Sequence, residues 1–530
     1  MGAQYSGLDW AVFGAYGLVI MLTGWYFNRK KSANSQEYFL GGNQMPTWIV
    51  AISVLATSQS AATFIGGPDQ GYQGDLSYLA TNIGAFIAAI CVAVFLIPKF
   101  YQYKVYTVYE LLEKRIGPNA KRQAGLMYLF GRVFASGARL YMAAIAVSMI
   151  LFGDIHASSV ITATIILTVV GLLYTVFGGI RTVIYSDVIQ CAIYVSAAIF
   201  VIYFLYIAIP ADFSQIVAAL QQPTPGAASK LALFKFDWDF SSAGVFNMAS
   251  VLTGFVLLNI AAFGLDQDMT QRILTCKNAK EGSKAMLFSV ALVIPVMFLF
   301  ILIGLLLFIF YQRPDLMMGG DVAVNQEFDG EKITIFMYYV LNEIPSGVRG
   351  LVTIGIIAAA LSTLNSGLNS MSSVLIQDIY RPLMQRKNKR LDDRHYVKAG
   401  QLGMAVVSVA LCSMAILCFY WQQYTEMPLL KFALSVMVFS YSGLLGVYFT
   451  ALFSKRGSER SVFAALVVGF LITLSFQPYI MEMLLPPSMQ FDLGFTWQLC
   501  IGTLVSLVVC LLGNSQEEST RNHFAMEQSK

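Results

Sequence analysis

Three apolar segments of the chain contain clusters of small, oxygen-bearing side chains whose chemistry suits a cation. The cluster in segment 46–67 consists of Thr57, Ser58, Gln59, Ser60 and Thr63; that in 247–271 of Asn259, Asp266, Gln267 and Asp268; that in 347–380 of Ser362, Thr363, Asn365, Ser366, Asn369 and Ser370. Hard cations take oxygen ligands, and calcium is expected to need more carboxylates than most of these positions supply. The pattern therefore favours a monovalent ion such as sodium.

The cluster in 46–67 has two interpretations. Small hydroxyl residues in a membrane span permit close helix packing. Alternatively, the span is unwound there, and a bound cation satisfies the freed backbone carbonyls. The cluster in 247–271 is a matching interruption five spans later, unless Asp266 and Asp268 already lie in cytoplasmic water. Paired interruptions in two halves of a chain are typical of inverted-repeat transporters.

Two arginines within one apolar run are the next residues that could do chemistry. Arg132 and Arg139 are seven residues apart, which places them on one face of a helix. Arg132 can extend toward the cytoplasmic side, whereas Arg139 is nearer the middle of the span. A guanidinium pairs well with a carboxylate, so the partner of Arg139 is either an anionic group of a substrate or an internal aspartate. Asp187 opens another span, as a sodium ligand or as a cytoplasmic cap.

Other functional classes find little support. Six of the seven cysteines lie in apolar runs, no pair has the spacing of metal ligands, and the three histidines are far apart. We find no nucleophile–base pair that would indicate an enzyme. The net charge of +4 comes from loops and does not indicate nucleic-acid binding.

The segments that must position these residues are membrane-spanning helices. Of the 530 residues, 57% are hydrophobic and only 12% charged, and a helix needs about 20 apolar residues to cross the bilayer. We predict an all-α polytopic membrane protein with about thirteen spans, at residues 9–27, 46–67, 77–98, 124–152, 157–178, 182–209, 247–271, 282–311, 347–380, 397–420, 428–453, 460–482 and 494–513.

Loop charge supports this count and gives an orientation. With the N-terminus outside, the cytoplasmic loops hold 26 of the 34 Lys and Arg residues and the outside loops hold five. The positive-inside rule predicts such an asymmetry. The first span has its positive charges after it rather than before it, which indicates an uncleaved span. We therefore expect an inner-membrane protein with a cytoplasmic C-terminus.

The chain is expected to form one membrane domain. Residues 45–209 and 246–453 would be two inverted repeats of five spans each, 454–513 additional spans, and 514–530 a cytoplasmic tail.

Several motifs in order resemble the sodium:solute symporter family over about residues 9–453. The most specific is YTVFGGIRTVIYSDVIQ at 174–190; others are EYFLGG at 37–42, YTVYELLEKR at 106–115, QRIL at 271–274 and LNSMSSVLIQDIY at 368–380. The resemblance implies a five-plus-five inverted-repeat core of the amino-acid-transporter type. It also implies a sodium-coupled carrier with no organic cofactor, which works by alternating access.

The resemblance further implies binding residues. The first sodium site would use the carbonyls of Ala56, Gln59 and Ala359 and the hydroxyls of Ser362 and Thr363. A second sodium site found in some members would use Asp187, Ser362, Asn365 and Ser366, although Asn365 stands where that site has a hydroxyl. The substrate positions would be Ser58, Ser60, Thr63, Asn82, Arg139, Asp266 and Gln267.

Two of these positions bear on the substrate. Members that carry galactose have a carboxylate where this chain has Asn82, and members that take proline or pantothenate resemble its GARL at 137–140. We expect a small carboxylate-bearing solute, such as an amino acid, a monocarboxylate or a sialic acid. A sugar or polyol is the alternative; a proton-coupled carrier or an ion channel is less favoured. The partners expected are this solute and membrane lipid; the oligomeric state stays open.

Overall fold

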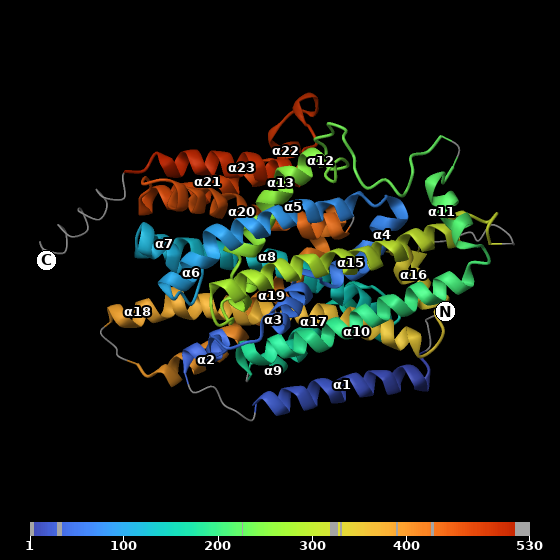
Figure 1. Ribbon diagram of the computed structural model, residues 1–530, viewed down its shortest axis with the longest axis horizontal. Helices are drawn as coiled ribbons and strands as arrows, with labels where there is room; N and C mark the ends of the chain where they lie inside the picture. Colours follow the sequence, from blue (N-terminus) through green and yellow to red (C-terminus); the bar gives the residue numbers. More distant parts are fainter. Residues whose placement is uncertain are drawn as a thin grey trace, which may run out of the picture.

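A computed structural model describes residues 5–28, 34–176, 178–224, 226–317, 327–328, 331–387, 391–425 and 429–514. The predicted tail therefore lies almost wholly outside the described residues, as does the basic stretch 29–31. The described chain is almost entirely helical, and its long helices run roughly side by side along the molecule (Figure 1). Its strands are the two-residue β1 Glu327–Phe328 and β2 Glu331–Lys332, which pair antiparallel.

The helices follow one another in this order: α1 Gly7–Asn28, α2 Ser35–Leu40, η1 Gly41–Asn43, α3 Thr47–Ser58, α4 Ala61–Gln73, α5 Ser77–Cys91, η2 Val92–Leu96, α6 Ile97–Tyr103, α7 Glu110–Arg115, α8 Pro118–Leu151, α9 Ala157–Thr175, α10 Gly179–Ala208, α11 Phe213–Gln221, α12 Met248–Leu252, α13 Gly254–Ile260, η3 Ala261–Leu265, α14 Gln267–Ile273, α15 Ala279–Gln312, α16 Ile335–Asn342, α17 Val348–Val374, η4 Leu375–Tyr380, α18 Arg381–Arg386, α19 Asp393–Thr425, α20 Leu429–Phe453, α21 Glu459–Ser475, α22 Pro478–Leu484, η5 Pro487–Met489 and α23 Phe495–Leu511.

The predicted spans correspond to helices throughout the described chain. Ten continuous helical stretches are long and apolar enough to cross a membrane, and the bent pair of α3 and α4 makes an eleventh. The last two predicted spans correspond to α21 and α23, which have 17 residues each. This length is at the short end of what crosses the hydrocarbon core.

The second predicted span is broken in its polar cluster. Helix α3 ends at Ser58 and α4 begins at Ala61, and the two are bent by 64°. Between them Gln59 (φ −88°, ψ 126°) and Ser60 (φ −128°, ψ 176°) are extended. The interpretation as an unwound span is therefore confirmed for this segment. Short polar side chains favour such a break because they compete for backbone hydrogen bonds.

The seventh predicted span is interrupted in the same way. The helical segment ends at Leu265, and α14 begins at Gln267. Asp266 between them is extended (φ −88°, ψ 117°), close to the conformation of Gln59, and its carboxylate accepts a hydrogen bond from the N–H of Asp268 (2.9 Å). An aspartate in this N-cap position satisfies one of the free N–H groups of the following helix.

Glycines decide how closely α4 packs against the long helix α15. A Cβ on Gly71 would meet the carbonyl oxygen of Ile301, and one on Gly304 would meet that of Pro68. The two backbones therefore touch at a distance that only glycine permits, as in the small-residue packing of membrane helices. This contact fixes the direction in which α4 leaves the break.

The two-glycine motif before α10 also has a steric reason. Gly179 has φ +59°, a conformation that side chains rarely adopt, and a Cβ there would meet the backbone carbonyl of Tyr38. Helix α10 therefore starts directly against α2, which places Asp187 two turns farther along, in the core.

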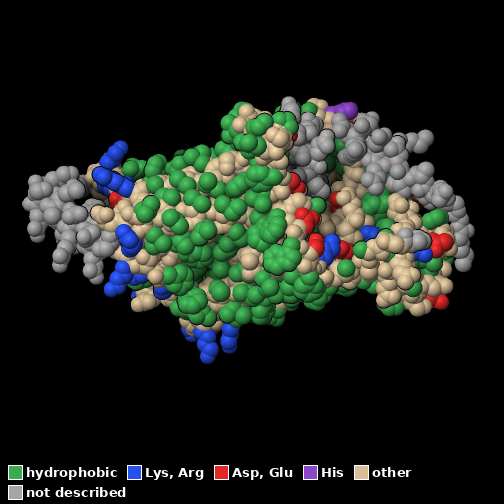
Figure 2. Space-filling view, turned by 90° about the horizontal axis from the view of Figure 1, so that it is seen from above, with side chains coloured by type: hydrophobic (Ala, Val, Ile, Leu, Met, Phe, Trp, Pro, Cys, Tyr) green, Lys and Arg blue, Asp and Glu red, His purple; other side chains and the backbone are tan. Residues whose placement is uncertain are grey.

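Apolar and charged side chains occupy different parts of the surface. Hydrophobic side chains cover a broad part of one face, which ends at a band of acidic and basic side chains (Figure 2). Lysines and arginines gather at the opposite end of the same view. An apolar belt between polar ends is the surface expected of a membrane-spanning bundle.

Candidate functional site

The break between α3 and α4 opens onto a cavity of about 120 Å³. The other walls come from α5, α8, α13, η3, α14, α15 and α20, and most of the lining is apolar. The polar residues that line it are Ser58, Gln59, Thr63, Thr81, Asn82, Arg139 and Asn259. An apolar pocket with a few convergent polar groups is the usual form of a small-molecule site.

Among the described residues that line this cavity, Arg139 is the only one with a charged side chain. Its Nη2 lies 3.3 Å from the sulfur of Met437, and its buried Nη1 has no hydrogen-bond partner. Within the described chain Arg139 forms no salt bridge. A guanidinium shielded from water with unused donors is costly, so the site is suited to a ligand that brings an anionic group.

Arg132 differs from Arg139 because carboxylates of the protein already neutralise its charge. Its guanidinium forms salt bridges with Asp266 (2.8 Å) and Asp268, and its side chain is only 2% exposed. Both carboxylates are buried as well. Two alternatives that the sequence left open are therefore excluded: Arg132 does not extend to the cytoplasmic side, and the two aspartates do not lie in cytoplasmic water. The physical reason is that each charge finds its partner inside the protein.

The structure does not bring Asp266 and Gln267 to the cavity. Asp266 accepts hydrogen bonds from Arg132 and from the hydroxyl of Tyr441 (2.6 Å). Gln267 accepts from the N–H of Val108 (2.9 Å) and donates to the carbonyl of Tyr106 (2.9 Å). Both side chains therefore hold elements together around α14.

The other predicted substrate residues lie nearer to Arg139. Ser58, Thr63 and Asn82 line the cavity with it. Ser60 lines a void of about 10 Å³ on the other side of Arg139, which Thr363 also lines. The structure thus gathers five of the seven predicted positions around the break.

Sequence reasoning missed three groups in the cavity wall. Thr81 and Asn259 had no assigned role, although Asn259 belongs to the second polar cluster. The carbonyl oxygen of the Gln59 side chain is buried without a partner, so this residue offers more than the backbone carbonyl expected of it. The signal that was available is the i, i+3 or i+4 spacing of polar residues toward one helix face.

The residues expected at the first sodium site are all buried. Ala56, Gln59, Ala359, Ser362 and Thr363 have exposures of 0–3%. Helix α17 packs against both α3 and α4, so its hydroxyls lie beside the break. The hydroxyl of Thr363 donates to the carbonyl of Ala359 (3.2 Å), and that of Ser362 donates to Asp187 (2.7 Å).

One residue expected at the second sodium site, Asp187, already has a positively charged partner. The carboxylate of Asp187 accepts hydrogen bonds from Ser362 and Ser53 and forms a salt bridge with Arg272 (3.1 Å). Arg272 belongs to the QRIL motif, had no role assigned to it from the sequence, and is fully buried. The guanidinium of Arg272 thus supplies the positive charge beside Asp187 that a second sodium ion was expected to supply.

The remaining two residues of that set differ from each other. Ser366 donates to the carbonyl of Thr363 (3.1 Å), whereas both amide atoms of Asn365 are buried without a partner. Neutral polar atoms left unpaired in a core are costly, which makes Asn365 a candidate for contact with a bound species.

Five of the buried charged residues form one chain. Arg272 bridges Asp187 and Asp268, and Arg132 bridges Asp268 and Asp266. Three carboxylates thus alternate with two guanidiniums across α10, α14 and α8. Buried pairs of this kind position the elements that carry them, and removing one member leaves an uncompensated charge.

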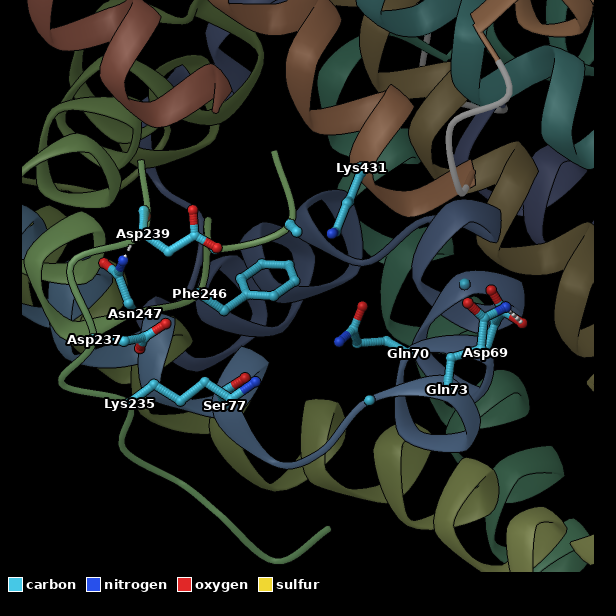
Figure 3. A pocket seen from close by; sticks show the side chains of 14 residues that line it. Asp69, Gln70, Gln73, Ser77, Lys235, Asp237, Asp239, Phe246, Asn247 and Lys431 are labelled. Carbon is cyan, nitrogen blue, oxygen red and sulfur yellow. Dashed lines mark hydrogen bonds between the residues drawn. The ribbon is translucent and has the colours of Figure 1, made fainter. Parts of the chain in front are cut away.

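A second, larger cavity of about 300 Å³ lies beyond the far end of α4 (Figure 3). Asp69, Gln70 and Gln73 of α4 line one side, the loop before α12 lines the other, and Lys431 reaches in from the start of α20. This cavity is polar and does not include the break, so it is not the primary site.

Comparison with known proteins gives the same architecture. The sequence model of the Sodium:solute symporter family matches residues 38–469. The sodium/sialic acid symporter SiaT of Proteus mirabilis is 25% identical, over 89% of this chain and 90% of the relative. The sodium/glucose cotransporter of Vibrio parahaemolyticus is 26% identical, over 93% and 89%.

Two solved structures share the fold. A Na+-coupled sialic acid symporter in a substrate-bound outward-open state superposes with a TM-score of 0.78 at 23% identity, covering 96% of this chain and 98% of the other. The nucleobase-cation symporter Mhp1 in a closed conformation gives 0.55 at 13% identity, covering 91% and 94%. The fold is therefore the inverted-repeat, LeuT-like one of sodium symporters.

Proposed function

Because this chain belongs to the sodium:solute symporter family, we propose that it couples inward sodium flow to the import of a small solute that bears a carboxylate. The observation that carries this proposal is Arg139, whose guanidinium lines the cavity at the break with a buried, unpartnered Nη1 and without a carboxylate partner in the described chain. A carboxylate would supply the missing charge and accept hydrogen bonds from the guanidinium.

The relatives are consistent with this substrate class. Two are named sodium/sialic acid symporters, and others are named sodium-coupled monocarboxylate transporter 2. The alternative is a sugar, as for the relative named a sodium/glucose cotransporter. The neutral cavity residues Ser58, Thr81, Asn82 and Asn259 suit hydroxyl groups equally well. A sialic acid would use both kinds of contact, since it has a carboxylate on a polyhydroxylated ring.

The proposed coupling site is the set of oxygens beside the break: the carbonyls of Ala56, Gln59 and Ala359 and the hydroxyls of Ser362 and Thr363. Sodium held there would join the end of α3 to α17. Substrate would contact the same break from the side of Arg139, with Ser58, Ser60, Thr63 and Asn82.

Energy coupling follows from this shared segment. An ion that orders the break raises the affinity for substrate, and substrate raises the affinity for the ion by the same factor. The corresponding coupling free energy is about 1–3 kcal/mol in typical cases. The membrane potential adds about 2.3 kcal/mol per charge for each 100 mV. One inward sodium ion is therefore sufficient for substantial accumulation.

The repeats and the orientation belong to the same proposal. Residues 45–209 and 246–453 would be the two inverted repeats, which is supported by the matching backbone conformations of Gln59 and Asp266. Residues 454–513 would add the last spans. The gathering of Lys and Arg at one end supports a cytoplasmic C-terminus in a bacterial inner membrane (Figure 2).

Uptake into proteoliposomes tests the function. The protein would be supplied with radiolabelled sialic acid, a monocarboxylate, proline and glucose, with an inward gradient of either sodium or choline. We expect accumulation of one carboxylated compound with sodium and none with choline. Accumulation of glucose alone would refute the carboxylate, and equal uptake with choline would refute sodium coupling.

A further inference from the structure

The loop before α12 contains a segment with two chemically different faces. Residues 234–240 form no helix or strand, and every second side chain is a solvent-exposed aromatic: Phe234, Phe236, Trp238 and Phe240, with exposures of 48%, 76%, 76% and 46%. The residues between them, Lys235, Asp237 and Asp239, line the cavity of about 300 Å³, and the four aromatics do not. The segment therefore has an aromatic face and a charged face.

Hydrogen bonds hold the backbone of this segment in place. The carbonyl of Lys235 accepts from the N–H of Met248 (2.8 Å), and that of Phe240 accepts from the N–H of Gly494 (2.8 Å). The side-chain amide of Asn247 donates to the carbonyl of Asp239 (2.8 Å). The charged face is anchored as well, because Lys235 forms a salt bridge with Asp75 (2.7 Å). The aromatic row is therefore presented outward by a fixed strap.

The strap lies at the level where several apolar spans begin. Its partners Met248 and Gly494 are at the first residues of α12 and α23, and Ser77, which lines the same cavity, opens α5. In the ribbon view the chain between α11 and α12 runs along the edge of the bundle, outside the ends of these helices (Figure 1). Because apolar spans begin where the hydrocarbon core begins, the strap is level with the boundary inferred from these helix ends.

The aromatic row continues the apolar surface of the bundle. The ring of Phe240 packs against that of Trp497 in the first turn of α23 (4.8 Å between centroids). Nearby, the connection from α21 to α23 exposes further large apolar residues: Met483, Leu484, Met489 and Phe491. Aromatic side chains are enriched at membrane interfaces, where an apolar body and a polar neighbourhood meet.

We propose that residues 234–240 form an interfacial strap whose aromatic row is embedded in the membrane boundary at this end of the bundle, while its charged row forms a wall of the outer cavity. The occupant of the aromatic face is lipid, because the row is continuous with the lipid-facing surface and lies level with the ends of the spans. Embedding would hold Lys235, Asp237 and Asp239 toward Gln70 and Lys431 across the cavity (Figure 3). The inference depends on neither sodium nor the solute.

Fluorescence of Trp238 tests the proposal. The full-length protein and a Trp238→Phe variant would be reconstituted into vesicles of ordinary phospholipid or of phospholipid brominated near the headgroup end of the acyl chains. The difference between the two proteins isolates the emission of Trp238. We expect brominated lipid to remove most of this emission and aqueous iodide to have little effect.

Trp48 is the matched control, because it is also exposed but opens α3, at the opposite end of the broken span. A Trp48→Phe variant measures the response of a tryptophan outside the strap. Quenching of Trp238 by iodide and not by bromine would place the row in water and overturn the proposal. Resistance to both would mean that protein covers the row, such as a second copy of the chain, and would overturn it equally. Monodisperse elution of each variant establishes that it is folded, independently of transport.

Discussion

Arg132 and Arg139 lie two turns apart on one face of α8, but only Arg132 is paired with carboxylates. The salt bridges of Arg132 with Asp266 and Asp268 tie α8 to α14, while the guanidinium of Arg139 is left to the cavity. The same residue type thus serves for assembly at one position and for binding at the other. This difference leads to the first prediction.

Arg139→Ala is expected to abolish uptake of the carboxylated solute while sodium binding persists. Removing one partner of a buried charged contact costs about 2–5 kcal/mol, which corresponds to a loss of affinity of about 30-fold or more. Substrate affinity and sodium-induced thermal stabilisation would be measured on the same preparation. Arg313→Ala is the control, since Arg313 pairs with Asp315 at the surface. Normal transport by Arg139→Ala would refute the anion-binding role.

Ser362→Ala combined with Thr363→Ala is expected to raise the sodium concentration required for half-maximal uptake. Both hydroxyls lie beside the break, and their loss removes two of the five proposed oxygen ligands. Ser372→Ala on the same helix is the control, because its hydroxyl bonds the carbonyl of Gly400 instead. If uptake at low sodium concentration is unchanged in the double variant, the site assignment is wrong.

The pair formed by Asp187 and Arg272 makes a prediction about stability. Breaking a buried pair on one side costs about 3–5 kcal/mol, because the other charge stays buried and uncompensated. We expect Asp187→Asn and Arg272→Gln each to lower the thermal midpoint, and the double variant to lose less than the sum. Additive losses would show that the two groups do not interact.

Asp187→Asn also distinguishes one sodium ion from two. If the only cation that Asp187 binds is the guanidinium of Arg272, a variant that still folds should move the same charge per substrate molecule as the unmodified protein. A changed ratio, measured as current against radiolabelled uptake, would establish that the carboxylate binds a second ion.

Lys230 makes a prediction about pH. Burial lowers its pKa from the usual 10.5 to about 8, although its ammonium donates to the carbonyls of Tyr72 and Gly74 at the C-terminal end of α4 (2.7 Å each). Between pH 8 and 10.5 the unfolded chain binds this proton and the folded chain does not, so the contribution of Lys230 to stability rises with pH. The thermal midpoint relative to that of Lys230→Met should therefore increase over this range. A constant difference would mean an unshifted pKa.

Gly304→Ala is expected to destabilise the bundle. The added Cβ would meet the carbonyl of Pro68 and the backbone of α4, and overpacking typically costs about 1–3 kcal/mol. Gly17→Ala in α1 is the control, because a Cβ there meets nothing within 4 Å. Equal thermal midpoints for the two variants would show that α4 and α15 can move apart freely.

The helical elements and their interruptions could be predicted from the sequence alone. Apolar runs of sufficient length predict spans wherever they occur, and the polar clusters around Gln59 and Asp266 predicted both interruptions. These features are local: the length of a span follows from the thickness of the bilayer, and an interruption follows from polar side chains that compete for backbone hydrogen bonds. For the same reason the motif-based positions Ser58, Thr63 and Asn82 were found in the cavity wall.

Which charges are neutralised by a partner depends on how the helices pack. Nothing local distinguishes Arg132 from Arg139, because the carboxylates that pair with Arg132 lie more than a hundred residues away, at the start of α14. The same holds for Asp187, which was expected to hold sodium and is paired with Arg272. The energy of a buried charge depends on what lies within a few ångströms of it, and that neighbourhood exists only once the helices have packed.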